Sequence, residues 1–317
     1  MAPLPPVICL LGPTAMGKTE TAMRIADQFP VDLVSVDSAL VYRGMDIGTA
    51  KPSAELLQAY PHALVDIADP ESPYSVADFV HDAREAIARS HARKRIPLLV
   101  GGTMLYFKRL LEGLAALPQR DLEVRRRIDQ EASESGWPAL HARLAEIDAA
   151  AAARIAPTDS QRIQRALEVF ELTGCTITLL QSRAAQVNEE WRVCRIALLT
   201  ENRAILHERI GQRFDTMMEL GFEREVEQLM SRPGVHRDLP SMRAVGYRQV
   251  AAWLDGECER DDAIRDAKTA TRRLAKRQHT WLRGMSDLAV FDPLEADVNA
   301  PILNLCEEVL STSGTPI

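Results

Sequence analysis

The first hundred residues alternate between short apolar runs and segments with helical periodicity. Apolar positions recur at helical spacing in residues 18–29 and 76–94, and Ser75 is placed to cap the second of these helices. The apolar runs, which we expect to be strands, are VICLLG (7–12), DLVSVDS (32–38), HALVDI (62–67) and IPLLVGG (96–102). Buried-type strands that alternate with helices are typical of a parallel sheet covered by helices on both faces. We therefore expect an α/β core of this architecture.

The pattern changes to almost continuous helix after about residue 112. Segments rich in Arg, Glu and Ala follow at 123–136, 138–148, 151–155 and 159–174. Asp159 or Ser160 is expected to cap the last of these helices. We interpret residues 113–187 as an all-helical domain inserted into a core formed by residues 1–112 and 188–317.

Strand character returns at residues 192–200 and is followed by more helix. Further helices are expected at 201–220, 223–230 and 261–284. The tail after Asp292 is weakly patterned, and we expect it to be loosely attached.

Composition indicates an ordinary globular protein that does not enter membranes. The chain has 317 residues, of which 46% are hydrophobic, and no apolar run approaches the ~18–20 residues of a membrane span. The N-terminal segment lacks the basic region and the cleavage site of a signal peptide, so we expect a cytoplasmic protein. The five cysteines are scattered, which favours reduced thiols over a disulfide framework or a zinc site.

Basic residues gather in short clusters although the formal net charge is −7. These clusters are Arg125–Arg127, Arg162 with Arg165, and Arg272, Arg273, Lys276, Arg277 and Arg283. Taken alone they are more simply explained as solvated helix faces than as a nucleic-acid surface. Binding depends on local patches more than on net charge, so the clusters leave nucleic-acid binding open.

A phosphate-binding motif lies between the first strand and the first helix. Its residues, which we call the phosphate loop, are Gly12, Pro13, Thr14, Ala15, Met16, Gly17, Lys18 and Thr19. They match the pattern G-x-x-x-x-G-K-[ST] in its required strand-to-helix context. Backbone N–H groups and the helix N-terminus attract phosphate oxygens, Lys18 adds a full charge, and the Thr19 hydroxyl can ligate Mg²⁺. The motif predicts a di- or triphosphate ligand, ATP included, without specifying which.

Two further candidates follow strands of the expected sheet. Asp37 ends the second strand and suits either a catalytic base or metal ligand, or a structural cap. Thr103 follows Gly101 and Gly102, where it suits either the orientation of a catalytic group or a tight turn. A P-loop sheet with an arginine-bearing helical insertion fits an ATP-dependent small-molecule kinase as well as another transferase. Residue chemistry alone does not separate these two readings.

Ordered motifs along nearly the whole chain resemble the tRNA dimethylallyltransferase family. The string VSVDSALVYRGMDIGTAKP (34–52) follows the phosphate loop at the family's distance. The other matching segments are DIADP (66–70), IPLLVGGTMLYFKRLLEGL (96–114), DSQRIQRALEVFELTG (159–174), RF (213–214), LPSMRAVGYRQ (239–249) and TRRLAKRQHTWLR (271–283). No motif position departs from the family in a way that puts activity in doubt.

The resemblance implies transfer of a dimethylallyl group from dimethylallyl diphosphate to the exocyclic amine of the adenosine that is 3′-adjacent to the anticodon. The phosphate loop would hold the diphosphate, with Thr19 helping to place Mg²⁺. Asp37 would accept the amine proton, Thr103 would line the same pocket, and Arg213 would face the diphosphate.

The resemblance also implies a set of tRNA contacts, and no obligate protein partner is evident from the sequence. The implied contacts are Asp37, Ser38, Ala39, Leu40, Thr103, Arg125, Gln161, Arg162, Ile163, Gln164, Arg165, Arg243, Ala244, Val245, Gly246, Tyr247 and Arg248. It implies that the basic clusters bind the tRNA backbone together, and so replaces their first interpretation as solvated helix faces. The alternatives are the kinase, which would ignore tRNA, and a nucleotide-gated RNA-binding protein, in which Asp37 would have no task.

Overall fold

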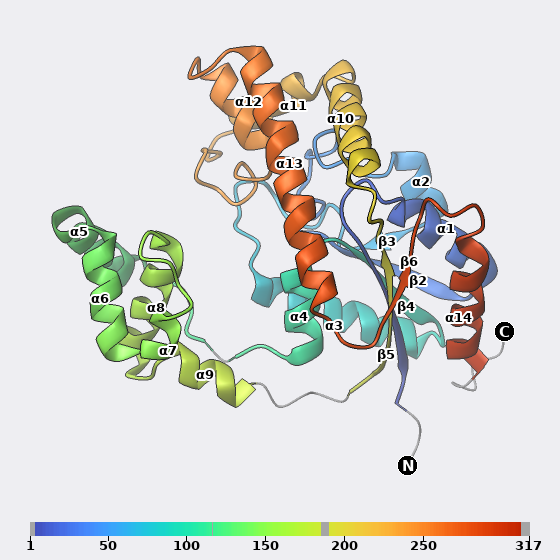
Figure 1. Ribbon diagram of the computed structural model, residues 1–317, viewed down its shortest axis with the longest axis horizontal. Helices are drawn as coiled ribbons and strands as arrows, with labels where there is room; N and C mark the ends of the chain where they lie inside the picture. The colour runs from blue at the N-terminus through green and yellow to red at the C-terminus, as the bar shows by residue number, and fades with distance from the viewer. Residues whose placement is uncertain (1–3, 116, 185–189, 312–317) are drawn as a thin grey trace. The chain divides into compact units, whose positions relative to one another are not determined.

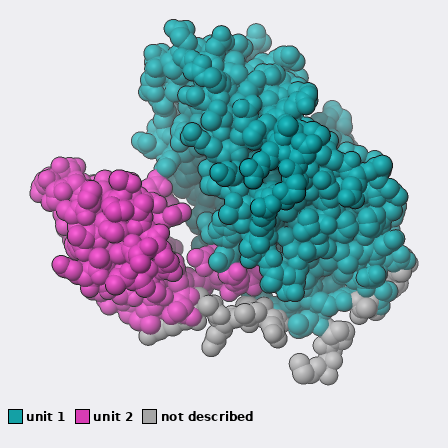
Figure 2. Space-filling model, viewed as in Figure 1, with its two compact units in different colours: residues 1–108, 189–317 teal, residues 109–188 magenta. Residues whose placement is uncertain are grey.

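The chain folds into two compact units in the computed structural model, which describes residues 4–115, 117–184 and 190–311. The first unit comprises residues 1–108 and 189–317, and the second comprises residues 109–188 (Figures 1 and 2). The limits of the inserted domain predicted from the sequence, 113–187, stay a prediction.

A six-stranded parallel sheet forms the centre of the first unit. Its strands lie in the order β3-β2-β4-β1-β5-β6, and every pairing is parallel. They are β1 (Pro6–Leu11), β2 (Val31–Val36), β3 (His62–Ala63), β4 (Ile96–Gly101), β5 (Arg192–Leu198) and β6 (Leu288–Phe291). Both β1 and β4 are buried along their whole length, as expected for central strands of a parallel sheet. The predicted α/β architecture is confirmed.

The third predicted strand is much shorter than expected. We predicted strand from 62 to 67, but β3 ends at Ala63. Leu64 and Asp66 have φ angles of 66° and 55°, in the left-handed region. A strand cannot continue through that conformation, so the chain turns away from the sheet.

Helices cover both faces of the sheet and continue beyond its carboxyl edge (Figure 1). In the first unit they are α1 (Lys18–Gln28), α2 (Ala54–Ala59), α3 (Val76–Ala92), α4 (Met104–Glu112, which runs on into the second unit), α10 (Arg203–Glu219), α11 (Phe222–Met230), α12 (Tyr247–Leu254), α13 (Arg260–Arg283) and α14 (Asn299–Ser311). Ser75 caps α3 in a complete capping box with Asp78, as the sequence predicted. Among the described residues, no helix combines the length and the apolar character that crossing a membrane requires.

The C-terminal segment packs into the core through α14, so the prediction of loose attachment was wrong for the residues up to Ser311 that the structure describes. Ile302, Cys306 and Leu310 of α14 are all fully buried in the cluster that also holds Ile8 of β1 and Ile25 of α1. Their spacing of four residues makes one continuous stripe along the helix. Burial of Ile302 and Leu310 alone stabilises the fold by several kcal/mol, at about 1.5–3 kcal/mol each.

The second unit is a small helical bundle around its own core. Its helices are α5 (Leu122–Ser135), α6 (Trp137–Ile147), α7 (Ala149–Ala152), α8 (Ser160–Thr173) and α9 (Ile177–Ala184). Ile128, Leu144 and Leu167 are fully buried in this core. Asp159 caps α8 by accepting the N–H of Arg162, which decides between the two predicted caps.

Candidate active site

The phosphate loop connects the central strand β1 to the start of α1. Gly17 has a φ angle of 78°, and α1 begins at Lys18. At Gly12 a Cβ atom would lie 2.8 Å from the carbonyl oxygen of Leu198, so only glycine fits there. The Lys18 ammonium folds back over the loop and donates to the carbonyl oxygens of Gly12 (2.9 Å) and Pro13 (2.7 Å). The loop therefore has the geometry predicted from its motif.

The electrostatics of Lys18 suit an anionic ligand. Burial lowers the pKa of Lys18 to about 8, while the negative charge of Asp37 acts to raise it and the positive charge of Arg213 to lower it further. Burial also lowers the pKa of Arg213, and Asp37 again opposes the shift. Two desolvated cations therefore lie near one carboxylate, and a bound polyanion would stabilise both of them.

Asp37 directly follows β2 and fixes the loop after it. Its Oδ1 accepts the N–H of Ala39 (2.8 Å) and the N–H of Leu40 (3.3 Å). No hydrogen bond to its Oδ2 comes from the parts of the chain that the structure describes. The residue is thus a structural cap through Oδ1.

Thr103 is joined to the same loop. Its Oγ1 accepts the N–H of Ser38 at 3.1 Å. Gly101 and Gly102 bring it there by close packing: a Cβ atom on Gly101 would lie 2.1 Å from the carbonyl oxygen of Val36. The predicted neighbours Asp37 and Thr103 therefore belong to one cluster at the carboxyl edge of β2 and β4, as expected for ligand sites in such sheets.

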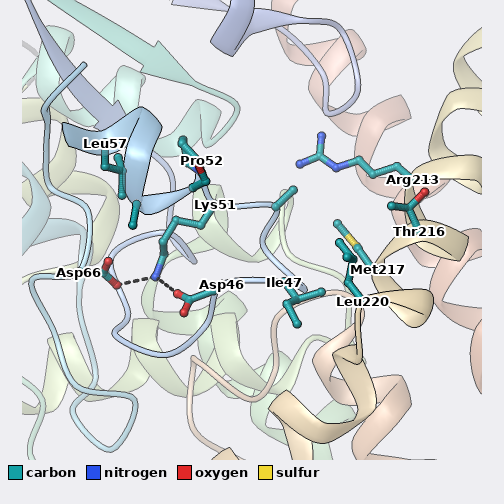
Figure 3. A pocket seen from close by; sticks show the side chains of 13 residues that line it. Asp46, Ile47, Lys51, Pro52, Leu57, Asp66, Arg213, Thr216, Met217 and Leu220 are labelled. Carbon is teal, nitrogen blue, oxygen red and sulfur yellow. Dashed lines mark hydrogen bonds and ion pairs between the residues drawn. The ribbon is translucent and has the colours of Figure 1, made fainter. Parts of the chain in front are cut away.

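A pocket of about 640 Å³ lies between the loop after β2 and helix α10. Arg213 extends from α10 toward the pocket, and Met217 and Leu220 form an apolar surface on the same side (Figure 3). On the opposite wall the buried ammonium of Lys51 binds the carboxylates of Asp46, at 2.5 Å, and Asp66. Since these acids already pair with Lys51, Arg213 is the cation that the pocket offers to an anion.

The predicted tRNA contacts of the first unit separate into exposed and structural residues. Ser38, Arg243 and Arg248 are exposed, whereas Ala39, Leu40, Ala244 and Val245 are half-buried. Tyr247 is buried, and its hydroxyl donates to Glu225 at 2.5 Å. Gly246, with a φ angle of 94°, forms the turn before α12. Within residues 243–248 the two arginines are the exposed side chains.

Those of the second unit separate in the same way. Gln161 and Arg162 are exposed on the first turn of α8, while Ile163 belongs to the core and Gln164 donates to Asp129 at 2.7 Å. Ile163 therefore supports the helix instead of presenting a side chain for contact.

Arg125 and Arg165 share one buried carboxylate. Glu168, fully buried, accepts Nε (2.9 Å) and Nη2 (3.0 Å) of Arg125 and Nη1 (2.7 Å) of Arg165. Burial alone would raise the pKa of Glu168, but the two arginines lower it overall. Both guanidinium groups are thus held in fixed positions.

Sequence reasoning assigned no role to several residues that organise the site. Glu225 accepts the N–H groups of Asp46, Ile47 and Gly48, and so shapes the loop that lines the pocket. Gln278 binds the phosphate loop and the Gly102 turn from α13. A signal for Gln278 exists, because it is an uncharged polar residue on the same buried stripe as Ala275 and Leu282.

The described residues contain no group of three or more His, Cys, Asp or Glu side chains that could hold a metal. The Thr19 side chain is exposed at the second position of α1. Magnesium commonly keeps its water ligands and binds through one protein oxygen together with substrate phosphates. The residues at the phosphate loop therefore fit a Mg²⁺ ion that arrives with a diphosphate, and not a permanent protein-only metal site.

Comparison with known proteins gives consistent matches over nearly the whole chain. A family model described as IPP transferase matches residues 40–285. A tRNA dimethylallyltransferase from Paraburkholderia phymatum is 52% identical over 309 residues, which cover 96% of this chain and 98% of that protein.

Solved structures agree with this result. The full-length tRNA isopentenylpyrophosphate transferase from Bacillus halodurans is 37% identical, covers 97% of both chains and has a TM-score of 0.71. A eukaryotic dimethylallyltransferase acting on tRNA shares the fold with a TM-score of 0.80 at 24% identity, over 99% of this chain and 81% of that one. From the family model and the Paraburkholderia relative together, the chain belongs to the IPP transferase family.

Proposed function

We propose that this protein is a prenyltransferase that moves a dimethylallyl group from dimethylallyl diphosphate to tRNA and releases diphosphate. Family membership and the 52% identical relative support the reaction. The single observation that carries it is the place of Lys18 after β1 and of Asp37 after β2 at the carboxyl edge of one parallel sheet, where the charges of Lys18, Asp37 and Arg213 act on one another. Such a set can hold a diphosphate and accept a proton in the same site.

The proposed acceptor is the exocyclic amine of the adenosine 3′-adjacent to the anticodon. The amine nitrogen forms a bond to C1 of the donor as the bond from C1 to the bridging oxygen breaks, and that electron pair leaves with the diphosphate. The amine proton passes to Oδ2 of Asp37, the oxygen that the loop does not use. Lys18 and Arg213 stabilise the charge that grows on the leaving group.

Mg²⁺ fits this proposal as a companion of the diphosphate. Bound beside the Thr19 hydroxyl, the ion would supply charge neutralisation to the leaving group. The protein residues Lys18 and Arg213 bind and orient the same oxygens from the loop and from α10. The prenyl diphosphate would enter the site through the pocket that Arg213 and the apolar side chains of Met217 and Leu220 line.

Recognition of tRNA is proposed to rest on exposed arginines in each unit. An adenine in the anticodon loop must leave its stack to reach Asp37, which costs a few kcal/mol, less than in a duplex. Contacts to the tRNA backbone offset that cost. Arg243 and Arg248 would supply them from the first unit, and Arg162, with the Glu168-held Arg125 and Arg165, from the second.

The test is transfer of label from radiolabelled dimethylallyl diphosphate to unmodified tRNA in the presence of Mg²⁺. We expect label in acid-precipitable RNA that depends on both tRNA and Mg²⁺, and nuclease digestion should return it on one adenosine next to the anticodon. A tRNA in which that adenosine is replaced by guanosine serves as the control. Absence of label on intact substrate tRNA would overturn the proposal, and label on another nucleotide would overturn the assigned acceptor.

A further inference from the structure

One side chain of helix α13, Gln278, lies between the phosphate loop and the end of β4 in the proposed active site. Gln278 is 8% exposed, and both polar atoms of its amide bind backbone groups. Its Oε1 accepts the N–H of Thr14, in the phosphate loop, at 3.2 Å. Its Nε2 donates to the carbonyl oxygen of Gly102, at the end of β4, at 2.8 Å. One amide group thus bridges two loops that are far apart in sequence.

The packing around this amide leaves no room for a side chain at position 102. A Cβ atom on Gly102 would lie 2.5 Å from Nε2 of Gln278 and 3.3 Å from the carbonyl oxygen of Gly12. The Gly102 turn, the phosphate loop and the amide are therefore in direct contact. Glycine at position 102 is what allows Gln278 to reach the carbonyl group.

Each end of the bridge continues into a residue with a proposed chemical role. On one side, Thr14 belongs to the loop whose carbonyl groups bind the Lys18 ammonium. On the other, Gly102 precedes Thr103, which accepts the N–H of Ser38 next to Asp37. The chain of contacts runs from the diphosphate-binding loop, through Gln278, to the loop that carries the proton acceptor.

We propose that Gln278 is a positioning residue that sets the spacing between the phosphate loop and the Asp37–Thr103 side of the active site. Each polar atom of its amide is bonded to a backbone group and the side chain is buried, so it acts through these loops and not on substrate. The rate of a transfer between two bound reactants depends steeply on such spacing, and a misplacement of about 1 Å can cost about 100-fold. The role in turnover rests on the proposed function, whereas the role in shaping the phosphate loop does not.

The first test replaces Gln278 by Met, which has a similar length but can neither donate nor accept at these positions. We expect Gln278→Met to lower kcat by about 100-fold, with the tRNA Kd unchanged. Affinity for inorganic pyrophosphate with Mg²⁺ should fall by about fivefold, the cost of one ordinary hydrogen bond. The matched control is Thr271→Val, which removes a hydrogen bond within α13 to the carbonyl oxygen of Ala267, about 10 Å along the helix axis from Gln278. A kcat and a pyrophosphate affinity for Gln278→Met equal to those of Thr271→Val would overturn the proposal.

The second test displaces the amide without changing it. Gly102→Ala puts a methyl group 2.5 Å from Nε2 and forces the amide to move, so we expect it to reproduce the loss in kcat of Gln278→Met. Because both changes remove the same bridge, the double variant should be no slower than the slower single variant. Multiplicative losses would overturn the proposal. If Gln278→Met fails to fold, Gly102→Ala is the remaining test. A kcat of Gly102→Ala equal to that of the wild-type protein would then overturn the proposal.

Failure of the proposed function can be distinguished from failure of the positioning role. A wild-type protein that transfers no prenyl group to tRNA contradicts that function but still binds pyrophosphate at its phosphate loop. Loss of pyrophosphate affinity in Gln278→Met would then support the positioning role, and equal affinity would contradict it.

Discussion

At the scale of single residues, the site depends on charged groups that are only partly compensated. Lys18 is the clearest case, because its ammonium is desolvated and its hydrogen bonds go to two carbonyl oxygens. A buried cation without a full counter-charge costs stability unless an anion binds next to it. The proposed binding of a diphosphate at the phosphate loop would offset this cost.

The lowered pKa of Lys18 predicts a pH dependence of anion binding. Burial brings this pKa to about 8, so the free protein loses the ammonium charge as pH rises through that value. We expect pyrophosphate affinity, measured by calorimetry from pH 6.5 to 9.5, to decline above about pH 8, and Lys18→Met to abolish that step. A profile of the same shape in both proteins would contradict the assignment.

The same shift has a defined sign for stability. The unfolded chain keeps Lys18 protonated up to the ordinary value of 10.5, so between about 8 and 10.5 the unfolded state binds more protons than the folded state. The contribution of this group to the free energy of unfolding therefore rises with pH across that window. Below pH 8 the buried charge is a constant cost.

At the scale of helices and strands, the second unit shows how a buried carboxylate can present two arginines. Glu168 and Glu171 lie one turn apart on α8, and each bridges two arginines. The partners of Glu168, Arg125 and Arg165, belong to the proposed tRNA contacts. The partners of Glu171 are Arg127 and Arg143. Glu171 and its two arginines are therefore a matched control for Glu168 and its two arginines.

We predict that Glu168→Gln weakens tRNA binding by about tenfold, close to the lower end of what a hydrogen bond to a charged group contributes. Its kcat at saturating tRNA should stay near the wild-type value, because the site in the first unit is unchanged. Glu171→Gln should lose comparable stability in thermal melting but keep its tRNA affinity. Filter binding and melting curves on both variants test this, and equal losses of affinity would contradict it.

Elements with clear periodicity could be predicted from sequence, whereas local turns and long-range contacts could not. The capping box at Ser75 and the phosphate loop contain their signals within a few residues. The early end of β3 depends on the left-handed conformation of Leu64, which no local pattern announces. The stripe of Ile302, Cys306 and Leu310 was present in the sequence of α14, but it was too short to separate from an irregular tail.

The candidate site divides along the same line. The neighbourhood of Asp37 and Thr103 follows from their places at strand ends, since the carboxyl ends of parallel strands meet at one edge. The bridge by Gln278 joins residues 264 positions apart, and its existence depends on where α13 packs. Sequence also could not tell that Tyr247 and Ile163, in segments expected to contact tRNA, are buried in the two cores.

At the scale of the whole molecule, a net charge of −7 coexists with arginines grouped on particular helices. Exposed basic side chains occur in both units, at Arg162 in the second and at Arg243 and Arg248 in the first. Their contacts with phosphate would release counterions from tRNA, so affinity should fall as salt rises. Net charge is a poor guide to this behaviour, because binding follows local potential.

We predict that the logarithm of tRNA affinity falls linearly with the logarithm of salt concentration. Arg162→Ala should reduce the slope by about 0.7–0.9, the value for one phosphate contact. Arg89→Ala removes an equal charge from α3, where Arg89 pairs with Glu85, and should leave the slope unchanged. Equal slopes for Arg162→Ala and wild type would exclude Arg162 from the interface.

Replacement of Asp37 by asparagine tests whether its carboxylate accepts the amine proton. Asparagine keeps the oxygen that caps Ala39 and Leu40 but cannot act as a base. The measurement is the single-turnover rate of dimethylallyl transfer to saturating tRNA. We predict a loss of about 1,000-fold in Asp37→Asn, with tRNA binding unchanged. A rate equal to that of the wild-type protein would contradict the account.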